Sequence, residues 1–199
     1  MTTLSQPTAA PLESRTALIQ ELNEHALVIE DVTLSSGAKA KYFIDAKRVI
    51  LRPSGFRLLI EQVQHYVSEF GATAVGGLTL GADAIACAAL VDGPEEVKGF
   101  FVRKEPKAHG LQKLIEGPQL EPGDRCLIVD DVVTSGASTI KAIKAIQDVQ
   151  GLEICGVLAV LDRLAGGASA IEAEAGAPFV PLTTIDEVYP ERPDRDLPK

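Results

Sequence analysis

The stretch Leu127-Ile128-Val129-Asp130-Asp131-Val132-Val133-Thr134-Ser135-Gly136-Ala137-Ser138 decides the fold of this chain. Three apolar residues lead into two adjacent carboxylates, and a short turn rich in hydroxyl groups and small residues follows. Helical spacing of apolar residues then runs from Thr139 to Val149. The pattern predicts a buried parallel strand, a tight loop and the N-terminus of a helix.

This predicted strand end has the chemistry of a sugar-phosphate site. Ligands of α/β sheets bind at the carboxyl ends of the strands. The first turn of a helix offers a phosphate unpaired N–H groups and a positive dipole end. Asp130 and Asp131 can accept hydrogen bonds from ribose hydroxyl groups. An ordinary buried strand with a polar end is the alternative interpretation.

A nucleotide triphosphatase is a further alternative, and the glycine-rich segment argues against it. Such an enzyme needs a G-x-x-x-x-G-K-[ST] loop beside the acidic strand end. The nearest candidate runs from Gly76 to Gly81, but Ala82 and Asp83 stand where a lysine and a hydroxyl residue are required. We therefore reject a triphosphatase site.

The segment from Leu127 to Ser138 resembles the 5-phosphoribosyl 1-diphosphate (PRPP) signature of type I phosphoribosyltransferases. The resemblance implies that Asp130 and Asp131 hold the ribose hydroxyl groups. It also implies that backbone amides and hydroxyl groups beyond them bind the 5′-phosphate. The implied PRPP-binding residues are Asp130, Asp131, Val132, Val133, Thr134, Ser135, Gly136, Ala137 and Ser138.

The segment from Arg103 to Pro118 lies between two predicted strands but lacks the apolar periodicity of a helix. A long irregular connection of this kind is usually functional or disordered. Its cationic side chains crowd together in a protein whose formal net charge is −9. A solvated surface loop is the alternative interpretation. The cationic residues are Arg103, Lys104, Lys107, His109 and Lys113.

The order of these residues, R-K-x-x-K-x-H-G followed by Ile115-Glu116-Gly117, resembles the mobile catalytic loop of orotate phosphoribosyltransferases. The resemblance implies that loop cations contact PRPP and stabilise the charge on departing diphosphate, with His109 as a candidate proton donor. It also implies a homodimer in which the 103–117 loop acts across the subunit interface. The implied loop residues are Arg103, Lys104, Lys107 and His109.

Two further segments resemble the orotate-binding parts of this family. Residues 33–45 look like its N-terminal lobe, where residues at the positions of Phe43 and Ile44 pack near the orotate ring. Leu161-Asp162-Arg163 resembles its closing strand, whose arginine contacts orotate. A guanidinium group suits a planar anion that carries a carboxylate. Thr134 is a further implied orotate contact, while core packing for Phe43 and a surface position for Arg163 are the alternatives.

The chain departs from the family pattern at two positions. Ser35 and Leu80 stand where many members have a lysine. Lys39 or Lys41 is a candidate substitute for the charge missing at Ser35. Thr79 and the backbone N–H groups around it remain able to bind diphosphate.

Predicted strands alternate with predicted helices, which favours an α/β fold with a mainly parallel central sheet and helices on both faces. The resemblance adds a small hood lobe formed by N-terminal and C-terminal segments. We expect one domain over residues 1–199, with loosely ordered tails at 1–12 and 190–199. The predicted helices are 13–27, 53–70, 82–90, 139–149 and 168–175. The predicted strands are 32–34, 41–44, 74–76, 98–102, 125–129, 154–161 and 179–180. A turn at Ser36-Gly37 is expected to join the first two of them.

Composition narrows the class of protein. The acidic net charge argues against a nucleic-acid partner. No apolar run approaches the roughly 20 residues that span a membrane, and residues 1–11 do not resemble a signal peptide. Cys87, Cys126 and Cys155 lie in apolar contexts without a C-x-x-C pair, so we expect buried free thiols in a reducing cytoplasm.

The resemblance implies transfer of the 5-phosphoribosyl group from PRPP to orotate, giving orotidine 5′-monophosphate and diphosphate on the route to UMP. It implies Mg²⁺ as cofactor, held mainly by substrate and water near Asp130 and Asp131. A phosphoribosyltransferase for uracil or a purine is one alternative. A non-catalytic PRPP-sensing regulator is another, and the residues at Ser35 and Leu80 give it some support.

Overall fold

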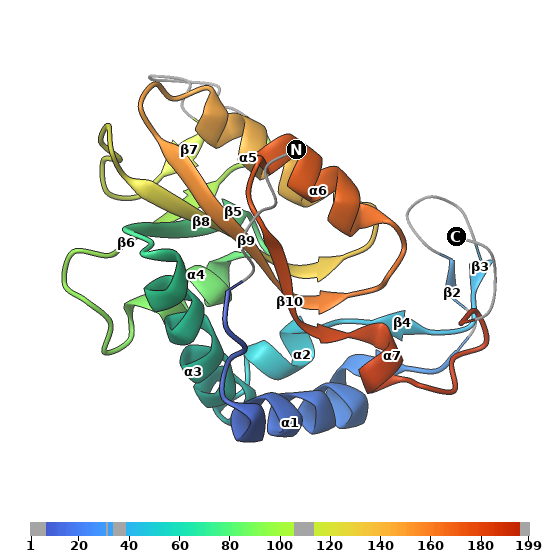
Figure 1. Ribbon diagram of the computed structural model, residues 1–199. Helices are drawn as coiled ribbons and strands as arrows, with labels where there is room; N and C mark the ends of the chain where they lie inside the picture. The colour runs from blue at the N-terminus through green and yellow to red at the C-terminus, as the bar shows by residue number, and fades with distance from the viewer. Residues whose placement is uncertain (1–6, 31, 34–38, 106–113, 196–199) are drawn as a thin grey trace.

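A six-stranded sheet with five parallel strands forms the centre of the computed structural model, which describes residues 7–30, 32–33, 39–105 and 114–195 (Figure 1). Its strand order is β10-β9-β8-β5-β6-β7, and only the edge strand β7 runs antiparallel. This confirms the predicted mainly parallel sheet. The strands are β5 (Ala74–Leu78), β6 (Lys98–Val102), β7 (Ile115–Glu116), β8 (Arg125–Val133), β9 (Glu153–Asp162) and β10 (Phe179–Thr184).

Helices cover both faces of the sheet, as predicted (Figure 1). One group packs on the face that carries Leu127 and Val129, and the other packs on the face that carries Cys126 and Ile128. Successive residues of a strand point to opposite faces, so the continuous apolar run of β8 contributes buried side chains to the core on both faces of the sheet. The first group is α1 (Leu12–Glu21), α3 (Pro53–Phe70) and α4 (Asp83–Leu90). The second group is α5 (Ala137–Gln147) and α6 (Gly167–Ala175).

Helix α3 has the boundaries that its sequence predicts. Pro53 stands at its first position, and Gly71 ends it with a φ of +56°, a conformation that glycine adopts at little cost. Within the residues described, no helix combines the length and the apolar character needed to cross a bilayer.

The hood pairs its short strands differently from the prediction. Strand β2 pairs with β3, and β4 pairs with β1 instead of joining a hairpin with residues 32–34. Both pairs are antiparallel and two residues long, so local sequence carries little signal for their partners. The remaining hood elements are β1 (Leu27–Val28), β2 (Val32–Thr33), β3 (Lys39–Ala40), β4 (Phe43–Ile44), the π-helix η1 (Leu22–Ala26), α2 (Lys47–Ile50) and α7 (Ile185–Val188).

The described parts of the two predicted loose tails pack against the domain. Ala10 is buried, and the Thr8 N–H donates to the Glu69 carboxylate at 3.0 Å. Arg192 is also buried, with ion pairs to Asp186 at 2.9 Å and Asp194 at 2.7 Å. The prolines and mixed charges predicted a loosely ordered tail over residues 190–199, but in its described part Arg192 pairs with Asp194 and with Asp186 on α7.

Two of the three cysteines are buried as predicted, and the prediction for Cys87 was wrong. Burial raises the pKa of the Cys126 thiol to about 12 and that of the Cys155 thiol to about 11. Cys87 is exposed on α4, although its neighbours Ala86 and Ala88 are buried. The apolar context of Cys87 reflects the inward face of this helix, whereas Cys87 itself lies on the outward face.

Candidate active site

The two acids lie inside β8, which continues to Val133 instead of ending at Val129. Strand alternation directs the two side chains to opposite sides of the sheet. Asp130 is 4% exposed, and one of its oxygens accepts a hydrogen bond of 2.7 Å from the Thr139 hydroxyl on α5. Asp131 is 9% exposed and accepts a hydrogen bond of 2.8 Å from the Lys47 ammonium group on α2. The acid pair therefore has two different environments.

Asp130 is the acid whose protonation is most perturbed by its surroundings. Burial raises its pKa to about 6, and the negative charge of Asp131 acts in the same direction. The hydrogen bond from Thr139 favours the ionised form but does not cancel these effects. Its charge therefore changes closer to neutral pH than that of an exposed aspartate.

Lys47 is a site residue that sequence reasoning missed. Its ammonium group bridges Asp131 and Asp45, at 2.8 Å and 2.9 Å. Partial burial lowers the pKa of Lys47, but hydrogen bonds to the two carboxylates outweigh this effect and raise the pKa above its ordinary value. Lys47 is separated from Asp131 by 84 positions, so no local motif could have signalled the contact.

The loop after the acids has the form that a phosphate requires. Gly136 caps the N-terminus of α5 with a φ of +79°, and no side chain caps the first turn. Its free N–H groups and dipole suit an anion. Gly167, the first residue of α6, packs closely against this loop. A Cβ at Gly167 would lie only 2.6 Å from the Thr134 carbonyl oxygen. The exposed residues of this stretch are Thr134, Ser135, Ala137 and Ser138.

The two valines of the signature contribute mainly to the fold. Val133 is buried in the core, and its carbonyl oxygen accepts a hydrogen bond of 2.9 Å from the Arg163 N–H. Val132 is half-buried, and its N–H donates to Asp131 at 2.9 Å. The valines thus hold Arg163 and Asp131 in place through their backbone groups.

The segment from Thr79 to Asp83 packs directly against the acid pair. A Cβ on Gly81 would lie 2.5 Å from an oxygen of Asp131 and 3.0 Å from an oxygen of Asp130. The Thr79 N–H donates to the Val102 carbonyl at 2.9 Å, and the Leu80 side chain is 73% exposed. The glycine-rich segment and the acids therefore form one surface, although this segment lacks a cation.

The described ends of the 103–117 segment pair with each other, and one of them contacts α5. The Arg103 N–H donates to the Leu114 carbonyl at 2.8 Å, and the Lys104 carbonyl accepts a hydrogen bond from Lys141 on α5. The Arg103 guanidinium lies 3.5 Å from Glu116. The predicted residues Lys107 and His109, together with Ser35 and the side chain of Lys39, lie outside the described residues.

Of the predicted orotate residues, Arg163 contacts Tyr42, the residue that directly precedes Phe43 and Ile44. The Arg163 guanidinium lies 5.0 Å from the centre of the Tyr42 ring, which is a cation–π distance. Tyr42 is buried, and its hydroxyl donates to the Asp194 carboxylate at 3.1 Å. Phe43 is 40% exposed and available to a flat ring, whereas Ile44 is buried in the core.

The oxygen ligands that the acid pair offers suit a hard cation that takes most of its other ligands from water or a bound molecule. Asp130 and Asp131 offer carboxylate oxygens, but the described residues contain no group of three potential metal-ligating side chains. Mg²⁺ commonly binds through one or two carboxylates together with water and phosphate oxygens. The acids therefore fit a Mg²⁺ ion that takes its other ligands from water or phosphate oxygens.

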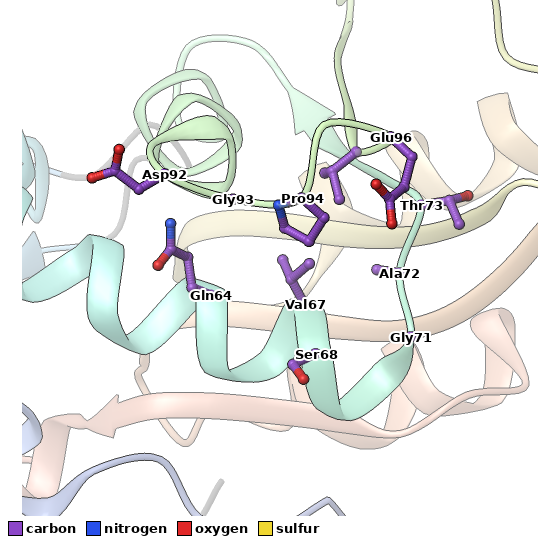
Figure 2. Close-up of a pocket in the computed structure, with 11 residues that line it drawn as sticks. Gln64, Val67, Ser68, Gly71, Ala72, Thr73, Asp92, Gly93, Pro94 and Glu96 are labelled. Carbon is purple, nitrogen blue, oxygen red and sulfur yellow. The ribbon is translucent and has the colours of Figure 1, made fainter.

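A separate cavity of about 310 Å³ lies at the opposite end of the sheet (Figure 2). Residues that precede β5 and β6, including Thr73 and Glu96, line it together with the end of α3. None of the residues in its lining is cationic, and it contains both Asp92 and Glu96. This cavity is thus unsuited to an anionic substrate.

Known proteins of one kind resemble the chain over most of its length. An orotate phosphoribosyltransferase of Rhodopirellula baltica is 45% identical over 177 residues, covering 84% of this chain and 90% of the relative. The Aquifex aeolicus orotate phosphoribosyltransferase is 42% identical over 181 residues, covering 87% of this chain and 97% of the relative. No model of a known protein family matches the chain.

Solved structures give the same result. The Mycobacterium tuberculosis orotate phosphoribosyltransferase in complex with PRPP has a TM-score of 0.72 and 34% identity. The match covers 88% of this chain and 98% of that one. A phosphoribosyltransferase from Corynebacterium diphtheriae has a TM-score of 0.77 and 32% identity, with the same coverage of both chains.

Gly81→Ala tests the close packing against the acid pair. The new Cβ would displace both carboxylates, and a misplacement of about 1 Å can cost about 100-fold in rate. We expect kcat/KM with orotate and PRPP to fall by about that factor, while the circular dichroism spectrum stays unchanged. Gly99→Ala is the control, because the nearest atoms that its Cβ would meet, at 3.0 Å and beyond, belong to the exposed side chain of Leu90. Equal activity of the two variants would contradict the proposed packing constraint.

Asp130→Asn tests the cost of burying this carboxylate. The folded-state pKa of about 6 exceeds the ordinary 3.8, so the acid's contribution to stability is lost as pH rises through that window. The amide can accept from the Asp131 N–H and donate to Thr139. We expect the variant to gain stability relative to the parent between pH 4 and pH 7, by at most about 3 kcal/mol. A difference in Tm that stays constant across this range would contradict the assignment.

Proposed function

The chain belongs to the orotate phosphoribosyltransferase family, and we propose that it transfers the 5-phosphoribosyl group from PRPP to orotate. The products are orotidine 5′-monophosphate and diphosphate, and the reaction serves the synthesis of UMP. The observation that carries the proposal is the buried Asp130–Asp131 pair beside the uncapped N-terminus of α5. This arrangement matches a ligand that combines ribose hydroxyl groups with a phosphate.

We assign the PRPP end of the site to the loop after β8 and to the segment before α4. Backbone N–H groups at Ala137 and Ser138 would bind the 5′-phosphate, supported by exposed hydroxyl groups in the same loop. Asp130 and Asp131 would accept hydrogen bonds from the ribose hydroxyls. Thr79 would contact the diphosphate.

We assign the orotate end to the surface between Arg163 and Phe43. The guanidinium of Arg163 would pair with the orotate carboxylate, and the exposed ring of Phe43 would pack on the flat base. Thr134 would approach orotate from the phosphate loop. Ile44 would act through its place in the core.

The proposed chemistry is a single exchange at the anomeric carbon. A ring nitrogen of orotate forms the new C–N bond while the bond from carbon to diphosphate oxygen breaks. Positive charge grows on the ribose, and the nearby carboxylates stabilise that charge. The cations Arg103, Lys104 and Lys107 would stabilise the diphosphate, with His109 as a proton donor, and closure of their loop would exclude water.

Mg²⁺ is the proposed cofactor, and Asp130 and Asp131 are the residues that would hold it, directly or through water. When bound, it would neutralise part of the diphosphate charge. We further propose a homodimer in which residues 103–117 act across the interface. A cytoplasmic location is supported by the three free cysteines.

The test of the function is the loss of orotate absorbance when purified protein meets orotate, PRPP and Mg²⁺. We expect consumption of orotate that requires both PRPP and Mg²⁺, with uracil and hypoxanthine inert as parallel substrates. Turnover of another base in place of orotate would overturn the assignment. Binding of PRPP without any turnover would instead favour a regulator that senses PRPP.

Mixed subunits test the shared site. Asp131→Asn and Lys107→Ala would each inactivate the homodimer, and we expect Lys107→Ala alone to lower kcat by about 10²–10³, since it removes one charge-stabilising contact. A mixed dimer would contain one site with neither substitution if the loop acts across the interface. We therefore expect partial recovery of activity after subunit exchange. No recovery, with exchange confirmed by mass spectrometry, would contradict a shared site.

A further inference from the structure

Lys47 connects the hood to the acid pair. It is the first residue of α2, directly beyond β4, yet its ammonium group donates to Asp131 on β8 at 2.8 Å. Asp45 holds the other side of the ammonium group at 2.9 Å, and one of its oxygens also accepts from the Lys47 backbone N–H at 3.2 Å. The lysine is therefore fixed before any substrate arrives.

Three contacts determine the orientation of the Asp131 carboxylate. The Val132 N–H donates to one oxygen at 2.9 Å, and Lys47 donates to the other. Gly81 packs against the first oxygen, and a Cβ at Gly81 would lie 2.5 Å from it. Each carboxylate oxygen has two lone pairs, so these two hydrogen bonds leave the carboxylate able to accept a further bond from a hydroxyl group of a ligand.

Lys47 also supplies charge where the neighbouring segment has none. Residues 76–83, which pack against the acids, include no lysine or arginine. Two adjacent buried carboxylates repel each other and would repel an anionic ligand. A cation on Asp131 reduces both effects.

The contact contributes little to the stability of the fold. The Lys47 side chain is 41% exposed, and partly exposed ion pairs contribute at most about 1 kcal/mol. A role in ligand binding accounts better for a lysine that is held by two carboxylates at the centre of the site.

We propose that Lys47 is a positioning residue for PRPP binding. It holds Asp131 in the orientation that accepts the ribose hydroxyl groups and offsets the charge of the acid pair. The inference rests on the proposed function, since PRPP is the ligand that it names.

The experiment compares three variants by calorimetric titration with PRPP and by steady-state kinetics. Lys47→Met keeps the chain length but removes the charge and the donors, and Lys47→Arg restores both. Arg48→Met is the matched control, because Arg48 is the exposed neighbour on the same short helix. We expect Lys47→Met to weaken PRPP binding by about 10- to 100-fold, the cost of a charged hydrogen bond. Lys47→Arg should recover part of the lost affinity. Arg48→Met should change PRPP affinity less than about 3-fold, and the KM for orotate should change less than about 3-fold in all three variants.

A double variant separates positioning from direct contact and from a structural role. If Lys47 acts through Asp131, Lys47→Met should weaken PRPP binding little further in an Asp131→Asn background. Fully additive losses would overturn the positioning role. Equal losses of affinity for PRPP and orotate in Lys47→Met, together with a lower Tm, would indicate a structural role and would also overturn the positioning role.

The outcomes for function and for Lys47 are distinguishable. Unchanged PRPP binding in Lys47→Met, with the parent protein active, overturns only the role of Lys47. The expected binding pattern in a protein that turns over no orotate supports Lys47 and overturns the transfer reaction. A parent protein that does not bind PRPP overturns both.

Discussion

Two adjacent carboxylates buried in the middle of a parallel sheet are the constraint around which this molecule is built. Removing a carboxylate from water costs several kcal/mol unless hydrogen bonds or counter-charges replace the lost solvent. The alternation of β8 divides this cost between the two faces of the sheet. Asp130 receives the hydroxyl of Thr139 from α5, and Asp131 receives the ammonium group of Lys47 from α2. Helix α5 thus supports the site as well as covering one face of the sheet, and α2 connects the hood to the same acid pair.

This division gives two neighbouring residues of the same type different properties. Asp130 has a neutral donor, and its burial moves its pKa toward neutrality. Asp131 has a cation as its partner. The different environments therefore give Asp130 a perturbed pKa and give Asp131 an ion pair with Lys47. The same crowding explains why Gly81 lies against both carboxylates, since any larger residue there would displace them.

The parts of the structure that sequence predicted are those with a local cause. The apolar run of β8 and the helix from Pro53 to Phe70 carry their signals within a few residues, and both form as expected. The acid pair and the glycine-capped helix start are also contiguous in sequence. Lys47 was missed because its partner lies 84 positions away, and the outward position of Cys87 was missed because apolar neighbours do not reveal which face a helix buries. Contacts between distant segments leave no periodic pattern, so only the folded chain reveals them.

The segment from Tyr42 to Lys47 shows why these missed contacts matter. Tyr42 places its ring against the guanidinium of Arg163, at the end of the site assigned to orotate. Five residues later, Lys47 binds Asp131, at the end assigned to PRPP. Phe43 is exposed between them, while the Tyr42 hydroxyl is tied to Asp194 near the other end of the chain. Because one short segment contacts both halves of the site, a displacement of the hood would disturb the arginine and the acid together. The proposed assignment therefore makes the relative position of the two substrates depend on the packing of the hood as much as on the sheet that carries the recognisable motif.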